Sequence, residues 1–148
     1  MKTVFDKATR EELINRINHL NENSEGQWGK MTVYQMVKHC RLWEEMTQGK
    51  IISKRVFIGR LFGRMALKMM LKDDKPMGKN APTSKELIVK EPNGDFVSER
   101  NQWIALLHEY DHFSPTGFIH PFFGKMTKEQ IGYFAYKHTD HHLRQFNC

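Results

Sequence analysis

Apolar residues recur along the chain at intervals of three and four, which is the period of one face of an α-helix. The first such set comprises Leu13, Ile14, Ile17 and Leu20. Thr9 and Glu12 form the pattern of a capping box, in which each side chain bonds the backbone N–H of the other residue. We therefore expect a first helix that begins near Thr9 and ends in the polar run after Leu20.

A second helix is predicted from a capping box of Thr32 and Gln35 to a stop at Gly49. Its apolar face is formed by Met36, His39, Leu42, Trp43 and Met46. A single histidine on such a face is more often a satisfied core residue than a metal ligand. His39 becomes a candidate ligand only if another helix brings further histidines to it.

Residues 53–72 are expected to form a third helical segment, and its character is unusual. Between positions 50 and 72 there is no acidic residue, whereas seven are basic: Lys50, Lys54, Arg55, Arg60, Arg64, Lys68 and Lys72. Such an amphipathic helix either touches a membrane surface or packs on the domain with its basic face in solvent. Gly59 and Gly63 lie four apart, which suits the close approach of another helix, so we favour the packed helix.

The remaining segments complete a helical pattern. Residues 73–94 are polar and rich in Pro and Gly, and are expected to form a long ordered loop. A fourth helix should start at Asp95 or Ser98, a turn-rich loop should cover 114–124, and a final helix should start at Thr127 with Gln130 as its capping partner. The prediction is one all-α domain, residues 1–148, built as an antiparallel four-helix bundle with an additional inserted basic amphipathic helix and a long ordered loop.

Composition narrows the class of protein. The chain has 148 residues, 39% of them hydrophobic, which is enough to bury a sizeable core. It contains neither an apolar run of about 20 residues nor a signal-peptide pattern, so we expect a cytoplasmic protein without stable membrane insertion. Two cysteines, Cys40 and Cys148, do not make a disulfide framework, and Cys40 is expected to be a buried, inert thiol.

The final helix carries the densest group of titratable side chains. His138 and His142 are four apart, so both imidazoles lie on one helical face, as a shared metal ion requires. His141 points about 60° away from His138, which makes it a neighbour rather than an equal ligand. The same face carries Ile131, Phe134 and Ala135 among its apolar residues, so the pair should point into the core.

Several motifs resemble the DinB-like superfamily of helical-bundle metalloproteins. Residues 138–145, HTDHHLRQ, are similar to its final-helix motif H-x-x-H-H-x-x-Q. Residues 28–40 resemble the second-helix entry of one bacterial branch of that superfamily, as do residues 74–77, 80–84 and 120–127. The resemblance extends over nearly the whole chain, from about Trp28 to Phe146. It implies a four-helix bundle with a divalent metal held by His39, His138 and His142.

Three neutral imidazoles would leave such an ion its full charge and at least one open position for water or substrate. Related DinB-like enzymes are thiol-dependent S-transferases or isomerases. The resemblance therefore implies metal-assisted thiol transfer with a low-molecular-weight thiol, and hydrolysis by activated water is the next reaction class. Zinc or nickel is the expected metal, and iron and manganese also accept imidazole. A non-enzymatic metal- or ligand-binding protein stays open as the alternative.

Further residues are expected to support the three histidines. Ligating imidazoles usually donate their second N–H to a carboxylate or carbonyl, and the candidates for this role are Glu44, Glu45, Asp140, His141 and Gln145. His120 is expected near the mouth of the site. The expected partner is a small-molecule substrate; no nucleic-acid signature is present, and a homodimer stays open.

Overall fold

The computed structural model describes residues 1–114 and 117–148, and most of them are helical. The elements in chain order are α1 (Lys7–His19), α2 (Val33–Thr47), α3 (Phe57–Met70), the short 3₁₀ helix η1 (Lys85–Leu87), α4 (Phe96–His108), the 3₁₀ helix η2 (Glu109–His112), β1 (Ile119–His120), β2 (Gly124–Lys125) and α5 (Lys128–Gln145). The turn expected at 114–117 includes Pro115 and Thr116, which lie outside the described residues.

Helix starts follow the capping signals at three of the four predicted places. Thr32 and Thr127 each form the expected capping box, with Gln35 and Gln130 respectively. α4 begins after Asp95, whose side chain accepts the backbone N–H of Ser98. The prediction for α1 was wrong, because its cap is Asp6.

The carboxylate of Asp6 accepts both the backbone N–H and the hydroxyl of Thr9, which therefore lies inside the first turn. Asp6 thus accepts the backbone N–H of Thr9, which the Glu12 side chain would have accepted in the expected capping box.

α1, α2, α4 and α5 pack around the main core. α4 contacts α1 and α2, and α5 also contacts α1 and α2. Fully buried side chains between these helices include Leu13, Ile17, Met36, Trp103, Leu107 and Leu143. The helical class is confirmed, and α2 and α5, which carry the three candidate histidines, lie beside each other.

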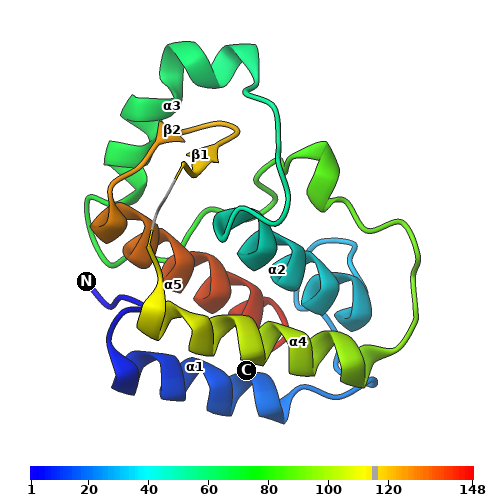
Figure 1. Cartoon of the computed structure of the whole chain (residues 1–148). Coiled ribbons are helices and arrows are strands. Elements are labelled where there is room, and N and C mark those ends of the chain that lie inside the picture. Colours follow the sequence, from blue (N-terminus) through cyan, green and yellow to red (C-terminus); the bar gives the residue numbers. More distant parts are fainter. Residues whose placement is uncertain (115–116) are drawn as a thin grey trace.

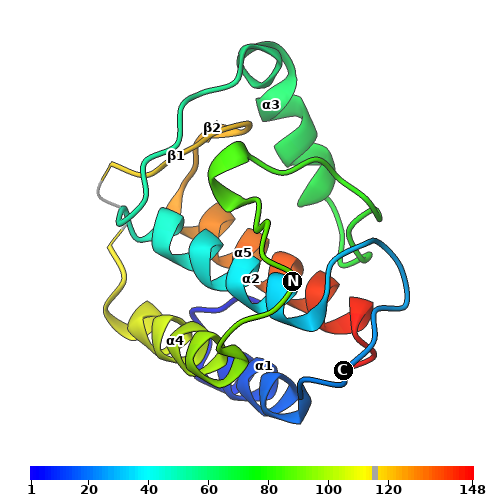
Figure 2. The same ribbon diagram turned by 90° about the vertical axis from the view of Figure 1, so that its right-hand side faces the viewer.

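A two-stranded antiparallel sheet, absent from the predicted all-α fold, follows η2. Ile119 pairs with Lys125 and His120 with Gly124, which makes a short hairpin. The hairpin and α3 lie on the side of α2 and α5 that faces away from α1 and α4 (Figures 1 and 2). α3 contacts β2, so the hairpin connects α3 to the rest of the fold.

The two glycines of α3 pack against a backbone that is not helical. A Cβ added at Gly59 or Gly63 would overlap the carbonyl oxygen of Phe122, which lies between β1 and β2. Helix α3 thus approaches the hairpin backbone directly, whereas we expected a second helix there. The close approach was predicted correctly, and the identity of its partner was wrong.

The long segment between α3 and α4 is mostly loop, with η1 as its one regular turn among the described residues. Leu87 in η1 is buried, whereas Ile88 is exposed. Lys137 of α5 donates from Nζ to the carbonyl oxygens of Met70 and Asp73, which fixes the end of α3 to α5. Within the described residues, no helix is both long enough and apolar enough to cross a membrane.

Candidate metal centre

Helices α2 and α5 bring His39, His138 and His142 together. All three side chains are buried, with 5%, 7% and 7% of their surface exposed. One ring nitrogen of each lies within 4.8 Å of the corresponding nitrogen of the other two, which is close enough to hold a metal ion. The i, i+4 pair on α5 and the single histidine on α2 therefore meet as their helical faces predict.

The distance between two of the ring nitrogens matches the separation of two nitrogens bound to one metal ion. Nε2 of His39 lies 3.3 Å from Nε2 of His138. Two imidazole nitrogens bound to a tetrahedral zinc ion at 2.0–2.1 Å are separated by about 3.3–3.4 Å. The ring centroids of the three pairs are 4.7–5.3 Å apart. These two nitrogens would thus need little movement to hold an ion together.

Two of the imidazoles have their tautomer determined by a hydrogen bond on the far side of the ring. Nδ1 of His39 lies 3.0 Å from the carbonyl oxygen of Leu87. A carbonyl only accepts, so Nδ1 carries the proton and donates it, which leaves the lone pair of Nε2 free. Outer partners of this kind orient ligating histidines and raise their basicity.

His142 has the same arrangement with a side-chain acceptor. Its Nδ1 lies 2.9 Å from Oε1 of Gln145, and Nε2 of that amide donates to the carbonyl oxygen of Trp28 at 2.8 Å. The second bond determines which end of the amide faces His142, because only the NH₂ group can donate to a carbonyl. Gln145, one of the residues expected to hold a ligand, thus contacts one, and Nε2 of His142 is free for a metal.

His138 is held by packing instead. Its ring stacks on Trp43, with centroids 4.8 Å apart, and more distantly on Phe134. Nδ1 of His138 is buried and has no hydrogen-bond partner among the described residues. Without an ion, His138 can donate from Nε2 to Nε2 of His39, and a bound cation would take the place of that proton.

The three imidazoles are in the uncharged form that a metal ligand needs. Burial lowers the pKa of His39, and burial together with the neighbouring His142 and His39 holds the pKa of His138 well below its usual range. Burial lowers the pKa of His142 to about 3, and His39 adds to the effect. Protonation of any of the three imidazoles is therefore disfavoured, whereas a metal ion could be held by their lone pairs.

Glu44 and Glu45 do not support the ligands, which corrects the expectation for both. Glu44 is fully buried, and its Oε2 accepts the hydroxyl of Tyr110 at 2.5 Å, away from the imidazoles. Burial raises the pKa of Glu44 to about 8. Glu45 forms an ion pair with Arg41 at 2.7 Å.

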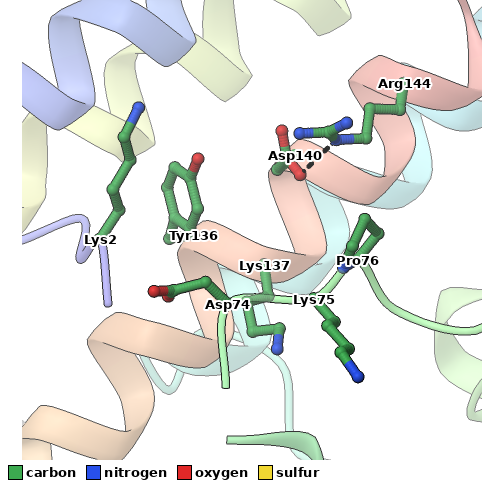
Figure 3. Close-up of a pocket in the computed structure, with 8 residues that line it drawn as sticks. All are labelled: Lys2, Asp74, Lys75, Pro76, Tyr136, Lys137, Asp140 and Arg144. Atoms are coloured by element: carbon green, nitrogen blue, oxygen red, sulfur yellow. Dashed lines mark hydrogen bonds and ion pairs between the residues drawn. The ribbon is translucent and has the colours of Figure 1, made fainter.

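Asp140 lies on the opposite face of α5 from His138. Its carboxylate pairs with Arg16 at 2.8 Å and with Arg144 at 2.7 Å. Figure 3 shows Asp140 and Arg144 at a pocket of about 320 Å³ that Tyr136 and Lys137 also line. Asp140 is thus structural, and this pocket is separate from the histidine cluster.

His141 and His120 flank the cluster without joining it. The ring of His141 lies 5.1 Å from that of His142 and 5.7 Å from that of Trp28. His120 accepts the backbone N–H groups of Phe122 and Phe123 on Nδ1, each at 3.1 Å. Both bonds would be lost on protonation, and burial lowers the pKa of His120 to about 4.

The ring of His120 meets that of Phe134, which in turn faces His138. His120 therefore lies one aromatic ring away from the ligands. Two backbone carbonyls, those of Leu87 and Trp28, are the supporting groups that sequence reasoning missed, because a carbonyl has no residue-type signal.

Comparisons with known proteins identify the family. Neither curated proteins nor solved structures give a match to the chain. A family model described as "Protein of unknown function (DUF1569)" matches residues 5–148, a range that holds all five α-helices and all three clustered histidines. The chain therefore belongs to the DUF1569 family.

Proposed function

We propose that the protein binds one divalent metal ion through His39, His138 and His142 and uses it in a reaction of a small molecule. The observation that carries the proposal is the convergence of three ring nitrogens, together with the orientation of His39 and His142. Each has its Nδ1 proton engaged by an acceptor outside the cluster, which leaves its Nε2 lone pair free in a cluster whose ring nitrogens lie within 4.8 Å of one another. A histidine that only fills a core also needs a partner for its N–H, so the support comes from the convergence of three ring nitrogens within 4.8 Å.

The donor set favours zinc or nickel, since imidazole suits both, and iron is a further candidate. Three neutral ligands would leave the ion its full charge, so that when bound it acts as a Lewis acid with a position for a small ligand. Leu87 and Gln145 orient the ligands. Trp43 and Phe134 exclude water from one side of His138, which strengthens electrostatic interactions at the site.

For the reaction itself, we propose thiol-dependent S-transfer, with hydrolysis as the second class. The support is the resemblance of residues 28–40 and 138–145 to DinB-like metalloproteins, in which α1, α2, α4 and α5 would form the four-helix bundle and α3 the insertion. The contacts of α4 and α5 with both α1 and α2 agree with that arrangement. A low-molecular-weight thiol is the proposed co-substrate.

A binding protein without catalytic activity is the second candidate, and the burial of the ligands favours it. Each of the three histidines exposes at most 7% of its surface, which leaves little room beside the ion for a substrate. An enzyme would need the covering segments, which include the loops that hold Trp28 and Leu87, to move away from the site. A site that only stores or senses a metal ion would not need this movement.

Metal content tests the ligand assignment. Protein purified without an affinity tag should contain close to one divalent ion per chain by elemental analysis. His39→Ala and His142→Ala should each lose the ion while keeping the helical circular dichroism spectrum. His19→Ala is the matched control, because His19 is exposed at the end of α1. Full metal retention in either ligand variant would refute the assignment.

Turnover then separates the two functions. A panel of low-molecular-weight thiols with model electrophiles, and of small esters and amides, should give product with the metal-loaded protein and not after chelation. His142→Ala should be as inactive as the chelated protein. Stoichiometric binding without product across the panel would favour the binding protein.

A further inference from the structure

Helix α3 exposes an apolar face that no other described part of the chain covers. Among the described residues, twelve large hydrophobic side chains are exposed, and eight of them lie between Ile52 and Met69. Phe57, Leu61 and Met69 expose 77%, 64% and 69% of their surface. Isolated exposed apolar residues are ordinary, but a cluster of this kind marks an interaction surface.

The arrangement around the helix explains why these residues face outward. Gly59, Gly63 and Leu67 are the buried residues of α3, and the two glycines face the hairpin. At 100° per residue, Phe57 lies about 40° outside the arc of about 100° that holds the other five exposed apolar side chains of α3. They are Ile58, Leu61, Phe62, Met65 and Met69. Helix α3 lies at the edge of the molecule (Figures 1 and 2), so this apolar stripe is on its outer side.

Cations border the apolar stripe along one side. Arg60, Arg64 and Lys68 are all exposed and follow one another at intervals of four. Lys54 and Lys72 extend the series beyond the two ends of the helix. Within residues 1–114 and 117–148, none of these five cations forms an ion pair, so their charges are available to a partner.

We propose that α3 is an interfacial helix that docks the protein on the surface of a membrane containing anionic phospholipids. An apolar stripe bordered by Lys and Arg is the pattern of helices that lie in the plane of the headgroups, with the apolar side chains among the acyl chains. Acidic headgroups complement the five unpaired cations. With 14 residues, α3 is too short to span a bilayer and suits this in-plane position.

Two other occupants fit the surface less well. Nucleic acid would use the cations on its phosphates but would leave Phe57, Leu61 and Met69 against water or a charged backbone. A second copy of the chain, with α3 packed on α3, would bring two identical rows of cations together on a chain of net charge +6. Anionic lipid is the partner that satisfies both the apolar stripe and the charges.

The contacts that hold α3 on the domain are compatible with this role. Its glycine face lies directly on the backbone of Phe122, and Val56 donates its N–H to the carbonyl oxygen of Pro121 at 3.1 Å. The helix is therefore attached through backbone on one side and leaves its large side chains for the partner. The proposal does not depend on the metal centre, since none of the three histidines lies in α3.

Vesicle sedimentation tests the proposal with the full chain. Vesicles of equal parts phosphatidylglycerol and phosphatidylcholine should bind the protein at low salt, and vesicles of phosphatidylcholine alone should bind it far less. Each Lys or Arg at an anionic surface strengthens binding about fivefold, so loss of three should weaken it on the order of 100-fold. The charge-neutralised variant is Arg60→Gln, Arg64→Gln and Lys68→Gln.

Two further variants separate the apolar and charge contributions. The apolar variant, Leu61→Gln with Met65→Gln, should lose binding although its charge is unchanged. The control variant removes three exposed cations from elsewhere and should bind vesicles nearly as well as the natural protein; it is Lys7→Gln, Lys30→Gln and Lys90→Gln. All these positions are exposed, so the variants should fold, which circular dichroism verifies.

Three outcomes would overturn the proposal. Absence of binding to the anionic vesicles is the first, and an apolar variant that binds as well as the natural protein is the second. The third is a stable dimer in sedimentation analysis that dissociates in the apolar variant, which would assign the stripe to a second copy of the chain. Loss of vesicle binding in both α3 variants, with the control unaffected, would establish α3 as the membrane-docking element.

Discussion

Replacement of Glu44 by glutamine should make the protein markedly more stable at alkaline pH. Glu44 is fully buried in α2, and its Oε2 accepts the Tyr110 hydroxyl, while its Oε1 has no partner among the described residues. The carboxyl therefore exchanges full hydration for one hydrogen bond. A glutamine has the same shape, keeps an oxygen for Tyr110 and cannot become charged.

The size of the effect follows from the pKa. Burial raises the pKa of Glu44 from 4.5 to about 8 in the folded protein. The folded state holds this proton more tightly than the unfolded state, so the contribution of Glu44 to stability is greatest below pH 4.5 and is lost progressively as the pH rises to 8. A difference of about 3.5 units corresponds to about 5 kcal/mol of unfolding free energy. Glu44→Gln should recover most of that amount at pH 8.5 and very little at pH 4.5.

Urea unfolding followed by circular dichroism between pH 4.5 and 9 measures this difference, with a chelator present so that no metal contributes. The comparison of variant with natural protein at each pH removes the contribution of the buried histidines, which titrate in both. Glu22→Gln is the matched control, because Glu22 is exposed and should show no such trend. A difference that stays constant across the pH range would refute the assignment of a buried, proton-bearing carboxyl at Glu44.

Three further predictions concern the metal centre and α3. Zinc affinity, measured against a competing chelator, should change little between pH 7.5 and 5.5. Burial lowers the pKa of His142 to about 3 and also lowers the pKa values of His39 and His138. Three imidazoles with the ordinary pKa of 6.5 would instead lose zinc affinity on the order of 1,000-fold. Gln145→Leu should weaken metal binding by about 10–100-fold by removing the acceptor of the His142 Nδ1 proton, whereas Gln102→Leu, at an exposed position, should not. Gly63→Ala should lower the free energy of unfolding by about 1–3 kcal/mol, because the new Cβ overlaps the Phe122 carbonyl oxygen. Gly78→Ala is the control, since no atom lies within 4 Å of a Cβ at that position. Equal urea midpoints for the two variants would contradict the contact between Gly63 and Phe122.

Helical periodicity predicted the faces that carry the three histidines, and the family resemblance implied that these faces meet. His138 and His142 share a face by their spacing, and His39 lies in the middle of the apolar face of α2. Two apolar faces in one small domain are buried against the same core, which allows the histidines on them to come close. The same reasoning placed the starts of α2, α4 and α5, whose caps are local signals.

The position of Glu44 on the helical wheel already argues against a role beside the histidines. Glu44 follows His39 by five residues, which places it about 140° around α2 and away from the ligand face. Its actual partner, Tyr110, belongs to η2, and no spacing rule connects the two. The acceptors that do orient the ligands, apart from Gln145, are carbonyls of Leu87 and Trp28, whose positions depend on how two loops fold over the site.

The orientation of α3 shows why a hydrophobic pattern can mark a face and still mislead about its partner. Large apolar residues dominate one side of α3 and cations border it, so the pattern alone directs that side toward the core. The structure instead buries the side that carries Gly59 and Gly63, because only there can the hairpin backbone at Phe122 come close enough. A glycine has no side chain and does not contribute to a hydrophobic pattern. The contact of Gly59 and Gly63 with Phe122, which holds α3 in place, therefore could not be predicted from that pattern. The large side chains remain outside, so α3 packs on the domain through its glycine face, as predicted, and leaves its apolar stripe and its cations exposed.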